Sequence, residues 1–232
     1  MTDLFNHGAI VSDEQLQNLK GRFVVFEGPD GSGKSTQFSR LADICEGVGL
    51  NVTVVREPGG TPIGERVREV LLDPQLDEMS LRCEMMLYMA SRAQLVEEVI
   101  RPALDRGELV LADRFVWSTI AYQGHAGGFP IDDIMLVAQA AVGHLDDGNW
   151  PDLTLLFDVD SETAATRLNP SKDRMELKGD SYHAKVREGY LVQARERPDL
   201  FAVIDSTGTI DETSALMFET IASHEALRAE HR

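Results

Sequence analysis

The sequence predicts an α/β fold in which one parallel sheet lies between two layers of helices. Three observations favour this class. Short β-branched runs alternate with longer helical patterns, the short runs are apolar almost throughout, and glycine-rich or charged turns follow several of them. At 232 residues the chain is long enough for one large domain with its own core. We therefore expect a three-layer domain with right-handed crossovers.

Five apolar runs are the predicted strands, namely Arg22–Glu27, Asn51–Arg56, Glu108–Ala112, Leu153–Val159 and Ala202–Asp205. Seven helices are predicted near Lys34–Gly47, Ile63–Leu72, Leu81–Asp105, Ile131–Ala141, Ser161–Leu168, Ser181–Glu196 and Asp211–Ala226. Residues 1–20 precede the first strand as an extension, and residues 21–232 make up the domain. Ligands bind at the carboxyl ends of the strands in such sheets, so the loops after the strands are the places to seek a site.

The balance of charge excludes some partners. The chain carries 22 Lys and Arg against 39 Asp and Glu, so its formal net charge is −17. A nucleic-acid or anionic-membrane surface needs a basic footprint, so neither partner is expected. No apolar run is long enough to span a bilayer, and the N-terminus has no signal-peptide pattern, which predicts a cytoplasmic protein. There, Cys45 and Cys83 are expected to be buried reduced thiols.

The loop after the first strand carries a phosphate-binding motif. Residues 28–35 match GxxxxGK[ST] and lie between a predicted strand and a predicted helix, the context that makes this motif specific. The glycines allow backbone N–H groups to surround phosphate oxygens, and the helix presents its positive end to the same anion. Lys34 would reach the β- and γ-phosphates and the Ser35 hydroxyl would bind Mg²⁺. An ordinary glycine-rich turn is the alternative interpretation.

This motif predicts a nucleoside triphosphate but not a reaction, because motors, GTPases, kinases and regulatory ATPases share it. The chain has no base-reading NKxD sequence, is short for a motor and is acidic for a helicase. A small-molecule kinase is therefore favoured.

Charged residues follow the second and third predicted strands. Arg56 opens the turn Arg56–Thr61, where it could meet a phosphate or simply be solvated. Asp113 could hold Mg²⁺ through water, and Arg114 could bind a phosphate with two parallel hydrogen bonds. An exposed pair at a strand end is the alternative for these two residues.

Two further segments, a predicted helix and a polar stretch, carry side chains that could bind a nucleotide. Tyr88 and Arg92 lie four residues apart on a predicted helix, so they share a face on which a nucleobase could stack and bond. A core tyrosine beside a solvent-reaching arginine is the alternative. The polar stretch 168–180, with Asp173 and Arg174, could be a mobile lid that carries a cation, or a solvated loop.

Together these motifs resemble the thymidylate kinase family. The resemblance covers about residues 20–225 and rests on Phe26–Thr36, Arg56–Thr61, Ser91–Leu95, Asp113–Gly124 and Pro151–Val159. It implies a P-loop NTPase three-layer sandwich with a five-stranded parallel sheet. It also implies transfer of the γ-phosphoryl group of ATP to dTMP, with Mg²⁺, by a homodimer packed through helices.

The resemblance also implies roles for single residues. ATP binding falls to Gly28, Pro29, Asp30, Gly31, Ser32, Gly33, Lys34, Ser35, Thr36 and Arg167. The acceptor would contact Asp30, Arg56, Glu57, Tyr88, Arg92, Arg114, Ser118, Thr119, Tyr122, Gln123 and Tyr190. Among these, Tyr88 would stack on thymine, Arg92 would bond its edge, Arg114 would hold the phosphate and Tyr122 would disfavour a ribose 2′-hydroxyl. Ser35 and Asp113 would bind the metal ion.

The catalytic residues implied by the resemblance are Lys34, Arg114, Asp30 and a lid arginine. Gly31 stands where some members of the family carry an arginine, so the lid is expected to supply that charge. Arg174 is the first candidate, with Arg167 and Lys172 behind it. Two alternatives to a dTMP kinase stay open: another nucleotide or nucleoside kinase, and a P-loop regulatory protein that binds ATP without phosphoryl transfer.

Overall fold

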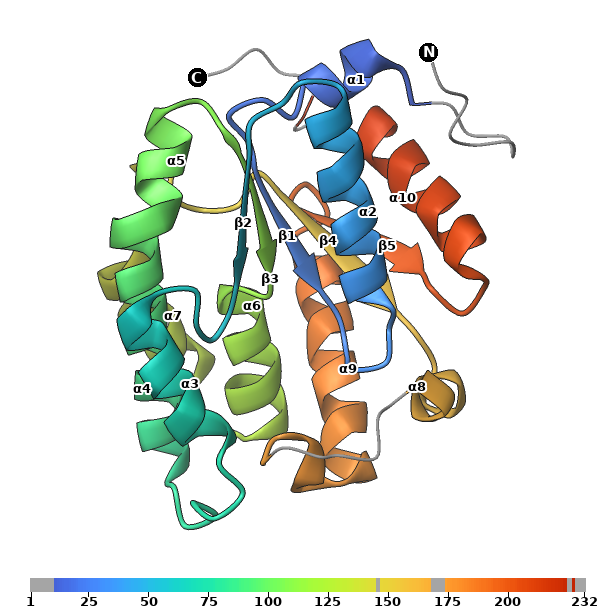
Figure 1. Ribbon diagram of the computed structural model, residues 1–232. Helices are drawn as coiled ribbons and strands as arrows, with labels where there is room; N and C mark the ends of the chain where they lie inside the picture. Colours follow the sequence, from blue (N-terminus) through green and yellow to red (C-terminus); the bar gives the residue numbers. More distant parts are fainter. Residues whose placement is uncertain (1–10, 145–146, 168–173, 225–226, 228–232) are drawn as a thin grey trace.

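The computed structural model describes residues 11–144, 147–167, 174–224 and Leu227. Its centre is a sheet of five parallel strands in the order β2-β3-β1-β4-β5 (Figure 1). The strands are β1 (Phe23–Glu27), β2 (Val52–Arg56), β3 (Leu109–Asp113), β4 (Leu153–Asp158) and β5 (Phe201–Asp205). The predicted α/β class with a five-stranded parallel sheet is confirmed. Because β1 is central and its two neighbours lead to opposite edges, the fold opens a ligand crevice beyond its carboxyl end.

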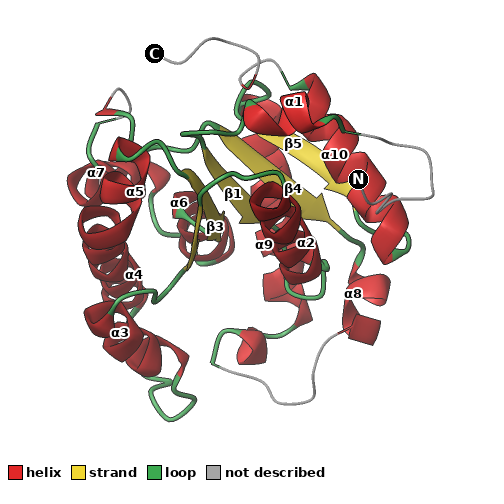
Figure 2. Ribbon diagram, turned by 45° about the horizontal axis from the view of Figure 1, so that its top comes forward, coloured by secondary structure: helices red, strands yellow, loops and turns green. Residues whose placement is uncertain are grey.

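Helices cover both faces of this sheet (Figure 2). They are α1 (Asp13–Gln17), α2 (Lys34–Gly47), α3 (Pro62–Leu72), α4 (Leu81–Leu95), η1 (Val96–Ile100), α5 (Arg101–Asp105), α6 (Val116–Thr119), η2 (Ile120–Ala126), α7 (Ile131–Val142), α8 (Ser161–Arg167), η4 (Glu176–Lys178), α9 (Asp180–Glu196) and α10 (Ile210–Ser223). In the part of the chain that the structure describes, no helix is long and apolar enough to cross a membrane.

The pleat of the central strand divides the core into two layers. Phe23 and Val25 point into a cluster built with α4, η1, α5, α6, η2, α7 and α9. Val24 and Phe26 point to the other face, into a cluster built with α1, α2 and α10. Successive strand residues face opposite sides, so a strand that is buried on both faces must be apolar throughout. In β1 this holds for every residue except the last, Glu27.

Two helical segments differ from the prediction. The expected helix Leu81–Asp105 is continuous but contains the π-helical turn η1, which precedes Pro102 at the start of α5. Residues 116–126 form α6 and η2, although no helix was predicted there. That stretch is rich in β-branched and aromatic residues, and its helical form is stabilised by packing against α9 and the sheet rather than by propensity.

The last part of the predicted extension packs on the domain. Ser12 caps α1, and Leu16 and Leu19 lie buried in the core cluster under α2 and α10. Cys45 is buried there too, as expected, but Cys83 is exposed, so the prediction for Cys83 is wrong. Position 83 lies in the first turn of α4, where the opposite face carries the buried residues Glu84 and Met85.

Candidate active site

The glycine-rich loop packs closely against its neighbours. Gly28 and Gly31 both have positive φ angles, of 146° and 80°. A Cβ atom on Gly28 would lie 2.4 Å from the carbonyl oxygen of Phe157, and one on Gly31 would lie 2.6 Å from that of Ala164. Neither position accepts a side chain without a shift of β4 or α8. Position 31 therefore cannot carry an arginine in this backbone arrangement.

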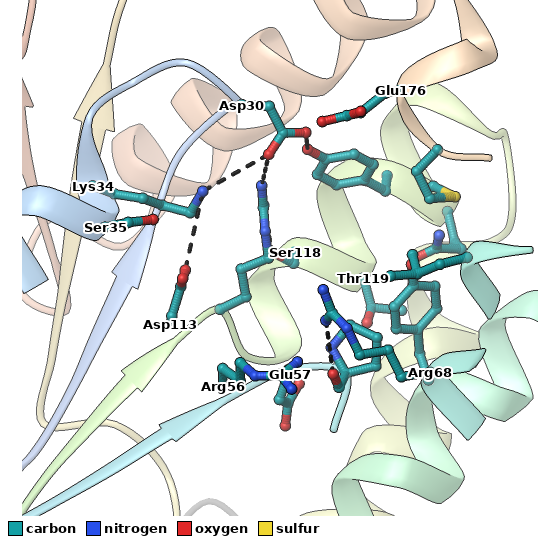
Figure 3. Close-up of a pocket in the computed structure, with 17 residues that line it drawn as sticks. Asp30, Lys34, Ser35, Arg56, Glu57, Arg68, Asp113, Ser118, Thr119 and Glu176 are labelled. Atoms are coloured by element: carbon teal, nitrogen blue, oxygen red, sulfur yellow. Dashed lines mark hydrogen bonds and ion pairs between the residues drawn. The ribbon is translucent and has the colours of Figure 1, made fainter. Parts of the chain in front are cut away.

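Two cavities meet at this loop. We name the first, of about 280 Å³, the strand-end pocket, because it lies beyond the ends of β2 and β3 (Figure 3). It is lined by Asp30, Lys34, Ser35, Arg56, Glu57, Pro58, Arg68, Leu72, Tyr88, Asp113, Arg114, Ser118, Thr119, Tyr122, Gln123, Met175 and Glu176. Nine of the eleven acceptor residues expected from the sequence are in this lining, and Arg92 and Tyr190 lie behind it.

We name the second cavity, of about 570 Å³, the P-loop pocket. It is lined by Asp30, Gly31, Ser32, Gly33, Lys34, Ser35, Thr36, Gln37, Arg167, Glu176, Ser206, Gly208, Thr209, Ile210 and Thr213. Gly28 and Pro29 shape the loop without lining the cavity. The two cavities share Asp30, Lys34, Ser35 and Glu176, so a ligand in one can touch a ligand in the other.

Arg114 crosses the floor of the strand-end pocket in a strained conformation. Its φ angle is 72°, and no other non-glycine residue in the described ranges has a positive φ. This backbone region costs about 1 kcal/mol or more for a residue with a Cβ atom. The guanidinium lies 2.6 Å from Asp30 Oδ1 and donates to Ser118 Oγ and Tyr190 Oη at 3.2 and 3.0 Å. Its charge is therefore fixed in place before any anion binds.

Glu27 holds the turn that carries Arg114. Its Oε1 accepts the backbone N–H groups of Phe115 and Ser118 at 2.9 and 3.1 Å. Its Oε2 accepts the hydroxyl groups of Ser118 and Tyr190 at 2.6 and 2.8 Å. The side chain is fully buried, and burial raises the pKa of Glu27 against the opposing effects of Arg114 and these hydrogen bonds. Glu27 is not among the site residues predicted from the sequence, because nothing there distinguishes it from any other polar residue at a strand end.

Lys34 and Asp113 face each other where the pockets meet. Lys34 Nζ lies 3.8 Å from Asp30 Oδ1 and 4.0 Å from Asp113 Oδ1. Burial and the nearby Arg114 charge lower the pKa of Lys34. Asp113 Oδ1 is buried and forms no hydrogen bond to the residues that the structure describes. An orphaned carboxylate oxygen near a lysine and the Ser35 hydroxyl suits a ligand that brings its own positive charge.

Arg92 forms a buried ion pair beside the pocket. It is 1% exposed, its Nε lies 2.9 Å from Glu57 Oε2, and its Nη2 donates to Thr119 Oγ1 at 3.2 Å. The guanidinium also covers the ring of Phe115 at 5.3 Å. The alternative in which Arg92 reaches solvent is excluded. Burial raises the pKa of Glu57 to about 7, although Arg92 opposes that shift.

Comparison with known proteins decides the family. The family model for thymidylate kinase matches residues 26–216. The chain belongs to the thymidylate kinase family. It is 44% identical over 195 residues to a thymidylate kinase from an Exiguobacterium species, covering 83% of this chain and 90% of that one. It is also 44% identical over 207 residues to a thymidylate kinase from Deinococcus radiodurans, covering 88% and 97% of the two chains.

A solved structure agrees with this assignment. The crystal structure of thymidylate kinase from Ehrlichia chaffeensis superposes with a TM-score of 0.68 at 30% identity, covering 86% of this chain and 97% of that one. Membership of the thymidylate kinase family thus rests on the sequence and on the fold together.

The two arginines expected in the lid region have different surroundings. Arg167 lines the P-loop pocket, where its guanidinium donates to the carbonyl oxygens of Ser206 and Gly208 at 2.8 and 3.1 Å. Arg174 lines neither cavity. It is 7% exposed, and its Nη1 lies 2.6 Å from Glu84 Oε2. The expectation that Arg174 faces the transferred phosphoryl group is therefore not met in this structure, and Lys172 lies outside the described residues.

Some residues at the two cavities were not predicted from the sequence. Arg68 extends from α3 into the strand-end pocket (Figure 3), and Glu176 borders both cavities. Ser206–Thr209 lies at the P-loop pocket directly after β5. The rule that ligands bind at strand ends points to this last segment. For Glu176, the first residue of the short helix η4, no sequence signal is evident.

The site makes a prediction about acid stability. Burial alone would raise the pKa of Asp30, but the charges of Arg114 and Lys34 outweigh it and lower that pKa to about 2. A carboxylate with a depressed pKa contributes stability above its unfolded pKa of about 3.9 and loses it as the pH falls through the folded value. The free energy of unfolding should thus drop by about 2 kcal/mol between pH 5 and pH 2 in excess of the drop in Asp30→Asn.

Urea titrations of both proteins across this range, with Asp77→Asn as the control for removing one exposed carboxylate, measure the difference. A difference between wild type and Asp30→Asn that stays constant from pH 5 to pH 2 would show that Asp30 is not held ionised by these cations.

Proposed function

We propose that the chain transfers the γ-phosphoryl group of ATP to the phosphate of dTMP, giving ADP and dTDP. The observation that carries this proposal is the junction of the two cavities at Asp30, Lys34 and Ser35. Donor and acceptor phosphates bound in adjoining cavities would meet there, which is the positioning that phosphoryl transfer requires.

The donor would occupy the P-loop pocket. Its phosphates would rest on the backbone N–H groups of the loop and on the N-terminus of α2, which has 14 residues. Lys34 would neutralise charge on the β- and γ-phosphates. Arg167, which borders this cavity from α8, is the better placed of the two lid-region arginines to supply a second cation.

The acceptor phosphate would bind at the floor of the strand-end pocket. Arg114 offers two nitrogen atoms in a fixed plane, the geometry that suits a phosphate group. Arg56 and Arg68 also border this cavity. Three arginines that line one pocket in a chain with a net charge of −17 favour an anionic acceptor.

The other end of the strand-end pocket suits a pyrimidine. Tyr88 offers a ring for stacking, and Thr119, Gln123 and Glu57 offer polar groups for the base edge, with Arg92 behind the pocket holding Glu57 in place. The ring of Tyr122 lies 5.3 Å from the Arg114 guanidinium and is held by a hydrogen bond from its hydroxyl group to Asp30 at 3.2 Å. We assign it the exclusion of a ribose 2′-hydroxyl, with Tyr190 and Ser118 positioning Arg114.

Mg²⁺ fits the donor site. Asp113 offers the orphaned Oδ1 atom and Ser35 a hydroxyl group at the same place, and these two residues would hold the ion together with phosphate oxygens and water. When bound, Mg²⁺ supplies positive charge to the phosphates. No group of three or more His, Cys, Asp or Glu side chains that could hold a metal ion gathers among the described residues.

The bonds that form and break in the reaction belong to the substrates, and no side chain forms a covalent bond. An oxygen of the dTMP phosphate forms the new bond to the γ-phosphorus, the bond from that phosphorus to the β–γ bridging oxygen breaks, and ADP leaves. The acceptor oxygen is already anionic, so no general base is needed, and Asp30 with a pKa of about 2 is unsuited to that task. Lys34, Arg114 and Arg167 stabilise the charge that spreads over the transferring group.

We further propose that two copies of the chain form a homodimer through α3, α4 and α7. Helices α3 and α7 both pack against α4, and each of the three exposes large apolar side chains. Ile63 and Val70 on α3 are 56% and 41% exposed, Met86 on α4 is 48% exposed and Leu136 on α7 is 68% exposed. Apolar groups gathered on neighbouring helices favour burial in an interface. The cytoplasmic location expected from the sequence stays a prediction.

The dimer is tested by sedimentation. Wild-type protein should sediment with twice the mass of one chain, and Met86→Glu, which places a charge in the apolar surface, should shift it to the mass of one chain. The matched control Lys185→Glu changes an exposed residue on α9, away from these helices. A wild-type protein that is monomeric at micromolar concentration would refute the dimer.

The activity is tested by ADP release with a panel of acceptors. Among dTMP, dUMP, UMP and thymidine, dTMP should give the highest kcat/KM, and thymidine should give none because it has no phosphate for Arg114. Lys34→Met and Arg167→Ala should each lower kcat by about 100-fold or more, since charge on the transferring group loses a partner. Lys185→Met serves as the control lysine variant. Equal rates with dTMP and thymidine, or wild-type turnover by a folded Lys34→Met protein, would overturn the assignment.

A further inference from the structure

Glu84 is a buried carboxylate that no part of the proposed reaction uses. It lies in the first turns of α4 and is 1% exposed. Its Oε1 accepts from Gln123 Nε2 at 2.8 Å and from Lys178 Nζ at 3.0 Å, and its Oε2 accepts from Arg174 Nη1 at 2.6 Å. One side chain thereby joins α4, η2 and the segment Arg174–Lys178, which are far apart in the sequence.

The partners of Glu84 build the base end of the strand-end pocket. Gln123 lines that pocket. Met175 and Glu176, which lie between Arg174 and Lys178 in the sequence, line it too. Arg174 also donates from Nε to the carbonyl oxygen of Leu71 at 2.8 Å, so the end of α3 is tied to the same point. Glu84 itself is outside the lining and can act only through these neighbours.

The chemistry of Glu84 also fixes the direction of the Gln123 amide. An ionised carboxylate accepts hydrogen bonds and donates none, so the amide nitrogen of Gln123 must face Glu84. The carbonyl oxygen is then the group that Gln123 presents away from Glu84. Burial opposes ionisation, but the hydrogen bond from Gln123 and the Lys178 and Arg174 partners hold the pKa of Glu84 below its usual value.

We propose that Glu84 is a positioning residue for the acceptor base: it fixes the Gln123 carbonyl oxygen and the Arg174–Lys178 segment so that the pocket favours a base with a ring N–H group. Thymine and uracil carry such a group at N3, where cytosine has an acceptor. This inference rests on the proposed function, because it needs a nucleotide in the strand-end pocket. It also gives Arg174 a task through Glu84 rather than at the phosphoryl group.

The test compares Glu84→Gln and Lys178→Met with Glu97→Gln, which removes a surface carboxylate paired with Arg101. In Glu84→Gln the new amide can donate or accept, so the Gln123 amide is free to turn. We expect the KM for dTMP to rise at least about tenfold, the preference for dTMP over dCMP to fall, and the KM for ATP to stay within about twofold. Lys178→Met should change the same quantities in the same direction by a smaller factor, and Glu97→Gln should change none.

A purely structural role for Glu84 predicts another pattern, in which the melting temperature and the apparent kcat fall while both KM values and the base preference are unchanged. That pattern would overturn the inference. If Glu84→Gln does not fold, Lys178→Met decides, because it leaves the Glu84–Arg174 pair intact. Wild-type protein without dTMP turnover would refute the proposed function itself, whereas wild-type turnover with unchanged KM values and base preference in the variants would refute only the role of Glu84.

Discussion

The buried carboxylate of Glu27, at the end of the central strand, is the constraint on which the site depends. A fully buried carboxyl group is stable only when donors surround it, and Glu27 has two backbone N–H groups and two hydroxyl groups within hydrogen-bond distance. Those donors belong to Phe115 in the turn after β3, to Ser118 in α6 and to Tyr190 in α9. Satisfying Glu27 therefore fixes the turn that begins with Arg114 and holds that residue in a backbone conformation it would not adopt alone.

The candidate site is rich in cations although the chain as a whole is acidic. The chain has a net charge of −17, yet the strand ends bring Lys34, Arg56 and Arg114 to the edge of one cavity. Cations gathered in a cleft focus the field there even when the rest of the surface is acidic. Each of these cations has a carboxylate partner, as Arg114 is paired with Asp30. The site is thus held in order without substrate, and phosphate oxygens can join or replace those partners when it binds.

Much of this arrangement is predictable from the sequence, because parallel strands bring their carboxyl ends to one edge. That rule alone places Lys34, Asp113 and Arg114 together, and the helical spacing of Tyr88 and Arg92 adds the base end. The Glu84 contacts with Arg174 and Lys178 span 90 and 94 residues, and no local pattern reports such a pairing. The helical form of residues 116–126 likewise depends on packing rather than on propensity, so the sequence does not predict it. Glu27 differs from an exposed glutamate only in its burial, which the sequence does not report.

The most direct measurement of the central constraint is the affinity of Glu27→Gln for dTMP, titrated by calorimetry without ATP. The amide has nearly the same shape but must place an NH₂ group against hydroxyl or backbone donors, so the turn and Arg114 lose their support. We expect the Kd for dTMP to rise at least about tenfold while the Kd for ATP stays within about twofold, with Glu46→Gln, an exposed residue on α2, as control. An unchanged affinity for dTMP in a folded Glu27→Gln protein would contradict the role of Glu27 in positioning Arg114.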